Sequence, residues 1–188
     1  MTIKSAEFIK SALENDPIFQ DGREQVACIG RSNVGKSSLI NALTSQKGLA
    51  KTSSFPGRTQ QINLFLINNS FYLVDLPGYG YAKLPKTVRQ DIENLVNWYF
   101  FVSGIKQKKV ILIIDAKVGT TKDDLEILEA LEAHGKDIII VANKVDKIKK
   151  ADYAKQIIKI KEIIGYHQII YCSAEKKIGV IEILKNLE

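Results

Sequence analysis

The chain has 188 residues, a length typical of a single domain. Hydrophobic residues make up 45% and charged residues 26%, a composition that excludes collagen, a long coiled coil and wholesale disorder. The formal net charge of +6 favours nucleic acid or another acidic surface as a partner, although a lysine-rich solvated surface explains it equally well.

Three further absences narrow the class of protein. No apolar run approaches the ~20 residues that a membrane span needs, and the first thirty residues contain no apolar signal segment. The two cysteines, Cys28 and Cys172, are too few for a disulfide framework, and we interpret both as buried apolar residues. We therefore expect a cytoplasmic protein that does not bind a membrane.

In chain order, short apolar runs that suit buried strands alternate with longer stretches that suit helices. The expected strands cover residues 25–29, 61–67, 71–75, 109–115, 137–142 and 168–172. The expected helices cover residues 36–44, 87–101, 122–133, 151–164 and 177–187. We expect residues 1–22 to form an N-terminal extension packed on the sheet edge, with residues 6–12 as an edge strand or a helix. Residues 23–188 are then the main domain.

This alternation predicts an α/β fold of three layers, with a mostly parallel sheet of six to seven strands. One connection differs from the rest. Only Asn68, Asn69 and Ser70 separate two expected strands, and so short a link joins antiparallel neighbours. We therefore expect one antiparallel hairpin in the sheet.

The first motif is a phosphate-binding loop. Residues 30–37 fit the pattern G-x-x-x-x-G-K-[ST] between an expected strand and an expected helix, which is the context that this motif requires. Lys36 is expected to bridge the β- and γ-phosphates, Ser37 to bind Mg²⁺, and the Ser38 amide to reach the α-phosphate. The predicted cradle consists of Gly30, Arg31, Ser32, Asn33, Val34, Gly35, Lys36, Ser37 and Ser38.

A second motif, D-x-x-G, ends the strand at residues 71–75. It consists of Asp75, Leu76, Pro77 and Gly78. Asp75 is expected to hold Mg²⁺ through water, because this ion keeps several waters and takes few protein carboxylates. Gly78 is expected to offer its amide to the γ-phosphate.

A third motif, N-K-x-D, follows a buried strand at Asn143, Lys144, Val145 and Asp146. A carboxylate at Asp146 can accept hydrogen bonds from N1–H and the amino group of guanine, whereas adenine has no donor at N1. Lys144 can cover the base and Asn143 can brace neighbouring loops. The small residues after the last strand, Cys172, Ser173 and Ala174, would let a backbone amide reach the guanine oxygen.

The order of these motifs resembles translation-factor-related GTPases with the P-loop NTPase, or small G-protein, fold. Three runs, at residues 30–43, 54–60 and 75–82, resemble the EngB (YihA/YsxC) family within the TrmE-Era-EngA-EngB-like superfamily. The resemblance implies that residues 23–188 are an EngB-type G domain using GTP/GDP and Mg²⁺. It also implies a bacterial GTPase of large ribosomal subunit assembly, needed for normal cell division and septation. Family members often carry Thr where Asn143 stands.

The resemblance also selects one metal ligand. The residues alone leave Thr52, Ser53, Ser54 and Thr59 open as a second hydroxyl for Mg²⁺, and the family pattern P-G-R-T-Q indicates Thr59. Its neighbours in the expected nucleotide-sensing loop are Gly57, Arg58, Gln60 and Gln61. The residues expected to support hydrolysis directly are Lys36, Thr59 and Gly78.

Tyr79 stands where many GTPases place a water-orienting Gln, so we expect slow intrinsic turnover. A partner or a cation would then complete the site. Asn33 resembles the Asn that holds K⁺ in potassium-stimulated GTPases, but it also suits a simple loop cap. Arg58 suits an arginine finger, although a contact to RNA or within the switch is the favoured interpretation.

Positive charge gathers on the expected switch loops, at Lys47, Lys51, Arg58, Lys83, Lys86 and Arg89, and again between residues 144 and 177. This favours the large ribosomal subunit or its RNA as the partner of a monomer. The alternatives are a small regulatory GTPase acting on a protein without RNA, and a nucleotide kinase, for which N-K-x-D has no purpose. The chain ends without a lipidation cysteine, which disfavours a membrane-bound version.

Overall fold

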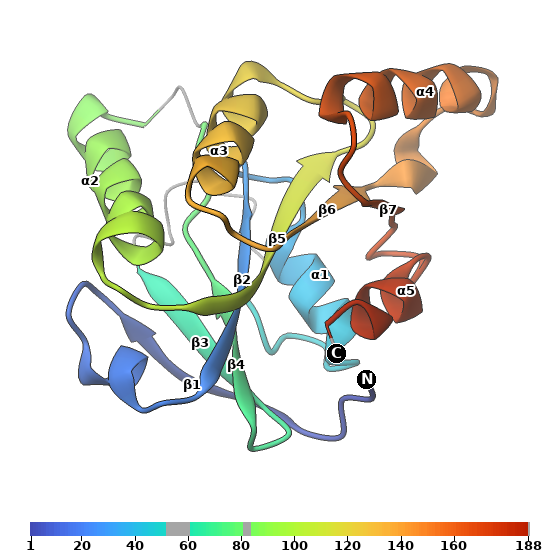
Figure 1. Cartoon of the computed structure of the whole chain (residues 1–188). Coiled ribbons are helices and arrows are strands. Elements are labelled where there is room, and N and C mark those ends of the chain that lie inside the picture. The colour runs from blue at the N-terminus through green and yellow to red at the C-terminus, as the bar shows by residue number, and fades with distance from the viewer. Residues whose placement is uncertain (52–60, 81–83, 188) are drawn as a thin grey trace.

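The computed structural model describes residues 1–51, 61–80 and 84–187, and in them a seven-stranded sheet forms the centre of the molecule (Figure 1). The strand order is β1-β3-β4-β2-β5-β6-β7. The strands are β1 (Ala6–Ala12), β2 (Glu24–Gly30), β3 (Ile62–Ile67), β4 (Phe71–Asp75), β5 (Gln107–Asp115), β6 (Ile138–Asn143) and β7 (Ile169–Tyr171). Strands β2, β4, β5, β6 and β7 pair in parallel, which confirms the predicted mostly parallel sheet.

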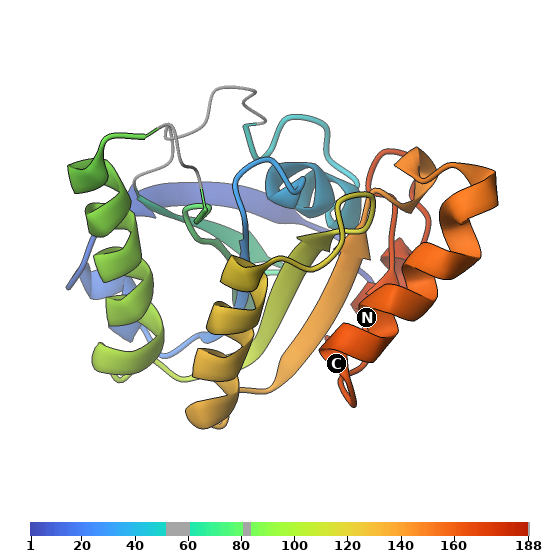
Figure 2. The same cartoon turned by 90° about the horizontal axis from the view of Figure 1, so that it is seen from above.

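Helices cover both faces of the sheet, so the fold has the three predicted layers (Figure 2). Helices α1 (Lys36–Leu43) and α5 (Val180–Lys185) pack on one face, around a core that includes Leu39 and Ile183. Helices α2 (Lys86–Asn97), α3 (Lys122–Ala133) and α4 (Tyr153–Ile164) pack on the other. The continuous apolar strands β5 and β6 are buried because both of their faces are covered.

The antiparallel hairpin lies where the short link predicts it. Strands β3 and β4 pair antiparallel, and the turn between them holds Asn68 and Asn69 at φ values of 50° and 53°. Asn tolerates this left-handed conformation better than most residues. Residues 6–12 form an edge strand rather than a helix, and β1 pairs antiparallel with β3, with Phe8 packed against Phe65 at 5.6 Å between ring centroids.

Helix α3 has its expected bounds, α1 and α4 are one and two residues shorter than expected, and α2 and α5 differ most. The last helix begins at Val180 instead of residue 177, because Lys177 and Gly179 adopt positive φ and residues 173 and 178 form a β-bridge. Helix α2 ends at Asn97 and continues as a π-helical turn, Trp98–Val102. This wider turn buries Tyr99 completely, and its hydroxyl donates to Gln25 Oε1 at 2.9 Å.

The remaining short elements are single turns of 3₁₀ helix at Pro17–Gln20, Val145–Lys147 and Lys150–Asp152. Phe19 in the first of these joins the same core as helices α2 and α3, so the N-terminal segment packs against the main fold. Within the part of the chain that the structure describes, no helix has both the length and the apolar character to cross a bilayer.

Candidate nucleotide-binding site

The strand register brings the three sequence motifs to one edge of the sheet. Cys28 in β2 pairs with Asp75 at the end of β4, and Gly30 at the end of β2 pairs with Ile113 of β5. One strand further along, Asp115 pairs with Asn143 at the end of β6. The carboxyl ends of parallel strands are where α/β folds bind ligands, so the motifs meet at the expected position.

The phosphate loop connects β2 to α1 through a tight backbone path. Gly35 has a φ of 97°, and a Cβ there would lie 2.5 Å from Asn143 Nδ2. A Cβ on Gly30 would lie 2.3 Å from the Ile113 carbonyl oxygen. Both glycines are therefore required by close packing, and helix α1 then begins at Lys36 with no acidic residue in its first turn. Its positive end is available for a phosphate.

Lys36 and Asp75 lie beneath this loop and influence each other's charge. Burial lowers the pKa of Lys36, and the nearby Asp75 carboxylate opposes that change. Lys36 Nζ donates to the Gly30 carbonyl at 3.3 Å. Burial raises the pKa of Asp75 to about 6, an effect that Lys36 reduces.

Asp75 is the residue whose surroundings best fit a metal ion. It is 5% exposed, and its Oδ1 atom has no hydrogen-bond partner among the described residues. In ranges 1–51, 61–80 and 84–187, no group of three or more His, Cys, Asp or Glu side chains is placed so that it could hold a metal ion. A hard ion that takes one carboxylate, hydroxyls, water and phosphate oxygens suits such a site, and Mg²⁺ is that kind of ion.

Gly78 lies directly against the phosphate loop. A Cβ on it would be 2.9 Å from both Lys36 Nζ and Ser32 N, so a side chain is excluded. Ser32 Oγ donates to the Gly78 carbonyl at 3.1 Å, and the Ser32 amide donates to the Tyr79 carbonyl at 2.9 Å. The D-x-x-G segment is therefore already joined to the loop that would hold the phosphates.

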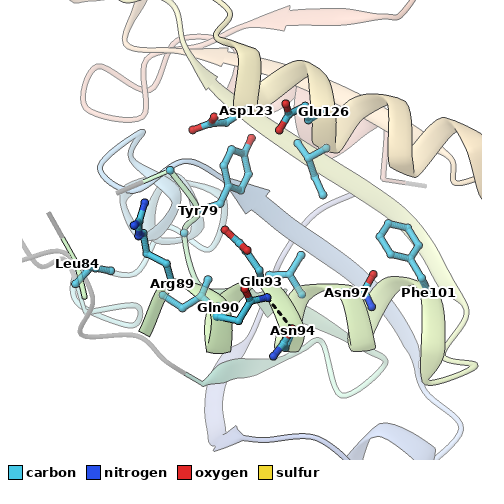
Figure 3. Close-up of a pocket in the computed structure, with 15 residues that line it drawn as sticks. Tyr79, Leu84, Arg89, Gln90, Glu93, Asn94, Asn97, Phe101, Asp123 and Glu126 are labelled. Carbon is cyan, nitrogen blue, oxygen red and sulfur yellow. Dashed lines mark hydrogen bonds between the residues drawn. The ribbon is translucent and has the colours of Figure 1, made fainter. Parts of the chain in front are cut away.

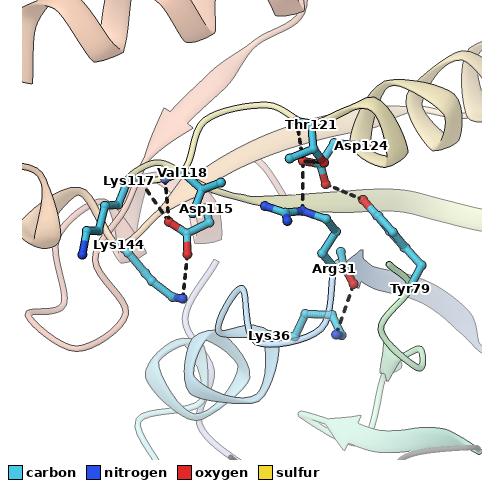
Figure 4. A network of polar contacts seen from close by, with 10 residues as sticks. Arg31, Lys36, Tyr79, Asp115, Lys117, Val118, Thr121, Asp124 and Lys144 are labelled. Atoms are coloured by element: carbon cyan, nitrogen blue, oxygen red, sulfur yellow. Dashed lines mark hydrogen bonds and ion pairs between the residues drawn. The ribbon is translucent and has the colours of Figure 1, made fainter. Parts of the chain in front are cut away.

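A buried network anchors this segment to α3, and sequence reasoning did not find it (Figure 4). Asp124 is 1% exposed and accepts a hydrogen bond from the Tyr79 hydroxyl at 2.9 Å. Arg31 Nε lies 3.3 Å from the other carboxylate oxygen, which also accepts from Thr121. Burial, with Asp124 second, raises the pKa of Tyr79. The available signal was Thr121-x-x-Asp124, a helix-capping pattern.

Asn143 joins the base side of the site to the phosphate loop. Its Nδ2 atom donates to the Val34 carbonyl at 2.9 Å, and its Oδ1 accepts from the Ala174 amide at 3.0 Å. Lys144 has a φ of 67°, and its ammonium donates to the Asn33 carbonyl at 2.6 Å. The two Asn143 contacts are the bracing expected of that residue, whereas the contact of Lys144 with Asn33 was not anticipated.

Asp115 is a further residue that sequence reasoning missed. It is 8% exposed, accepts from the Lys117 and Val118 amides, and pairs with Lys144 Nζ at 2.7 Å. It ends β5 just as Asp75 ends β4, so the signal used for Asp75 was present for Asp115. The structure makes it a positioning group for Lys144.

Asp146 is held between the N-K-x-D turn and the loop after β7. Burial alone would raise its pKa, but hydrogen bonds from Ser173 and Lys147 outweigh burial, and the pKa is lowered. Lys147 Nζ lies 3.2 Å from Asp146 and 2.8 Å from Glu175. Asp146 is therefore a charged acceptor at neutral pH, as selection of guanine requires.

The structure describes some of the remaining predicted site residues and not others. Ser37 and Ser38 lie at the start of α1. Leu76 and Pro77 after β4, and Val145, are buried, whereas Gln61 just before β3 is exposed. Cys172 is buried, its amide donates to Ala142, and burial raises its pKa to about 12. Gly57, Arg58, Thr59 and Gln60, and the basic Lys83, lie outside the described residues.

A separate cavity of about 670 Å³ opens between α2 and α3 (Figure 3). Tyr79, Arg89, Glu93, Phe101 and Asp123 are among its lining residues. Of the predicted nucleotide-binding residues that the structure describes, it includes Gly78 alone. This cavity is therefore distinct from the nucleotide site and shares only the D-x-x-G segment with it.

Two family models match the chain. The model described as 50S ribosome-binding GTPase matches residues 25–144, and the model described as the elongation factor Tu GTP binding domain matches residues 103–188. The first match exceeds half of the chain and contains both the phosphate loop and D-x-x-G.

Named relatives extend over nearly the whole chain. The probable GTP-binding protein EngB of Clostridium kluyveri is 46% identical, with 100% of this chain and 96% of that protein covered. The protein of the same name from Acholeplasma laidlawii is 44% identical, with 98% and 96% covered.

Solved structures of GTP-binding proteins are similar in fold to this chain. The crystal structure of a probable GTP-binding protein engB has a TM-score of 0.70 and 28% identity, covering 87% of this chain and 95% of that one. Era in complex with MgGDPNP and nucleotides 1506–1542 of 16S ribosomal RNA has a TM-score of 0.69 and 26% identity, covering 87% and 55%.

Proposed function

The chain belongs to the EngB family of GTP-binding proteins and hydrolyses GTP, and from that premise we propose that it is a GTP-gated factor in assembly of the large ribosomal subunit. In the GTP state it would dock on the subunit or its RNA as a cytoplasmic monomer, and hydrolysis would release it. Loss of this activity would impair ribosome production and, through it, normal cell division and septation.

The observation that carries this proposal is the match of residues 25–144 to a family described as 50S ribosome-binding GTPases. The Era structure supports the RNA component alone, since Era is described in complex with MgGDPNP and nucleotides 1506–1542 of 16S ribosomal RNA. The net charge of +6 is of the sign that phosphate backbones attract.

The proposed chemistry assigns a task to each side of the site. Lys36 and the amides of residues 30–38 would bind the phosphates, and Asp146 would select guanine. Ser37, Thr59 and, through water, Asp75 would hold Mg²⁺, which neutralises charge that develops on the transferred phosphoryl group. The unpartnered Oδ1 atom of Asp75 supports this role.

Turnover by the chain alone is expected to be slow. Tyr79, where a water-orienting side chain would stand, has its hydroxyl bonded to the buried Asp124. We propose that K⁺ near Asn33 supplies the missing positive charge. Asn33 has a φ of 67°, which equally suits a loop cap. GTP turnover in KCl should exceed turnover in NaCl several-fold, and equal rates would remove the cation from the mechanism.

The test of the proposed function is co-sedimentation with purified large ribosomal subunits. Binding should occur with a non-hydrolysable GTP analogue, weaken steeply as salt is raised, and be lost with GDP. Small subunits serve as the control. If large subunits pellet without the protein in every nucleotide state, the alternative of a regulatory GTPase that acts on a protein partner without RNA replaces this proposal.

A further inference from the structure

Helix α4 and the turn before it carry a surface that the nucleotide site does not use. Residues 149–166 contain five lysines and only two acids, Asp152 and Glu162. All five lysines are exposed. We call this surface the α4 lysine face, and its members are Lys149, Lys150, Lys155, Lys159 and Lys161.

None of these five lysines forms an ion pair with any residue in 1–51, 61–80 or 84–187. Elsewhere in the described chain lysines do find acids: Lys109 lies 2.8 Å from Asp137, and Lys147 lies 2.8 Å from Glu175. Lys155 and Lys159 are also one helical turn apart, and like charges at that spacing repel each other. An external anion would relieve this repulsion.

The neighbouring helix has the opposite charge. Helix α3 carries five acids, namely Asp123, Asp124, Glu126, Glu129 and Glu132, against the single Lys122. Both helices pack on the same face of the sheet, and α4 lies at its outer end beside β7 (Figures 1 and 2). A polyanion approaching this side is therefore attracted to α4 and repelled by α3.

The apolar side of α4 excludes a membrane as the partner. Ile160 and Ile164 are buried in the core, so the helix cannot offer them to lipid. Tyr153, Ile158 and Ile163 are 41%, 57% and 39% exposed, but at intervals of five residues they lie on different sides of the helix and form no apolar stripe. A membrane-surface helix needs a continuous apolar face, whereas a phosphate backbone needs spaced cations.

We propose that the α4 lysine face is an RNA-binding surface that contacts the phosphate backbone of ribosomal RNA. This inference rests on the proposed function and adds the surface that performs the docking. It differs from the expectation placed on the switch loops, because α4 keeps its charge whichever nucleotide is bound. The face would supply standing attraction to RNA, to which a nucleotide-dependent contact is added.

The test compares two variants with the same change of net charge. Lys155→Glu/Lys159→Glu reverses two charges on α4, and Lys4→Glu/Lys106→Glu reverses two exposed lysines remote from α4. Binding to purified large subunits and to deproteinised large-subunit RNA is measured over a series of KCl concentrations. GTP affinity, which involves none of these residues, verifies that each variant is folded.

We expect the α4 variant to bind RNA roughly tenfold more weakly or worse, because two attractive contacts become repulsive. The slope of log K against log salt should fall by about 1.4, or ~0.7 for each lost contact to single-stranded phosphate. The control variant should change affinity less than about twofold.

Four outcomes overturn the proposal. If both variants lose affinity equally, bulk charge and not α4 attracts RNA. If the α4 variant binds RNA like the wild type, or if subunits bind but deproteinised RNA does not, α4 is not an RNA surface, although the proposed function survives. If the wild type binds neither subunits nor RNA, both the proposed function and the proposal for the α4 lysine face fail.

Discussion

Polar groups on the base side of the nucleotide site are hydrogen-bonded to one another. On the phosphate side, by contrast, the buried charged groups Asp75 and Lys36 are less well satisfied. Asn143 uses both its amide atoms, and Lys144 bonds to Asn33 and Asp115. On the phosphate side, Asp75 Oδ1 has no partner among the described residues, and burial disfavours the charge on Asp75 and on Lys36.

The difference shows how the free energy of binding is distributed. A base pocket that is already assembled loses little conformational entropy when the nucleotide binds. Its contacts with the base therefore contribute almost fully to affinity and selectivity. On the phosphate side, burial makes the charged forms of Lys36 and Asp75 unfavourable, and contacts with phosphate and Mg²⁺ would offset that cost. Ligand binding should therefore stabilise the protein mainly through the phosphate side.

The largest expected effect tests the base side. Asp146→Asn should weaken GTP binding by roughly 10²- to 10⁴-fold, because two hydrogen bonds to a charged acceptor are lost. The variant should favour xanthosine triphosphate, whose extra carbonyl accepts from the new amide. Titration with fluorescent nucleotides measures both affinities. Asp152→Asn, which changes an exposed acid on the neighbouring turn, is the control, and unchanged GTP affinity in Asp146→Asn would refute the assignment.

A smaller effect tests the unpaired carboxylate. The pKa of Asp75 in the folded protein is raised from 3.8 to about 6, so the folded chain keeps a proton that the unfolded chain has released. Raising the pH through this window should therefore lower the free energy of unfolding, by up to about 3 kcal/mol. Above about pH 6 this contribution is constant.

Urea denaturation of the nucleotide-free protein in EDTA measures this dependence. Asp75→Asn should lack the decrease, so the difference between variant and wild type isolates one group from the other titrating residues. Magnesium and GTP should raise the stability of the wild type at neutral pH more than that of the variant, which lacks the carboxylate proposed to hold the ion. Parallel pH profiles for the two proteins would show that Asp75 is not strained by burial.

The smallest effect concerns one of the preformed contacts on the phosphate side. Tyr79→Phe removes the hydrogen bond to Asp124 that holds the Gly78 segment near the expected γ-phosphate. GTP affinity should fall about three- to tenfold while GDP affinity is unchanged, because Gly78 would contact only the γ-phosphate. Tyr72→Phe, which removes a similar bond to Asp21 far from the site, is the control. Equal losses for GTP and GDP would contradict this positioning role.

Much of the site could be predicted from the sequence because its chemistry lies in short runs. The phosphate loop, D-x-x-G and N-K-x-D each sit at a strand end, and a parallel sheet gathers those ends at one edge. The hairpin followed from a link too short for a crossover. The extent of the last helix did not, since its start depends on a bridge between Ser173 and Ile178.

The residues that were missed are separated in the chain from the groups they contact. Asp124 meets Arg31 and Tyr79, from two other segments, and Asp115 meets Lys144. A single sequence shows no sign of such pairs, because a capping acid or a strand-end acid has many possible partners. Only burial identifies Asp124 as a junction, since a carboxylate that is 1% exposed must have its charge satisfied.

By itself, then, the sequence determined the fold class, the nucleotide motifs and the excess of positive charge, since each depends on local spacing or on a count. Tertiary structure decided which charges are satisfied. It paired Lys144 with Asp115 and left an oxygen of Asp75 without a described partner. It also placed five lysines, none with an ion-pair partner among the described residues, on the outer end of one helical layer. Pairing requires two groups to meet within a few ångströms, and that distance is set by strand register and packing.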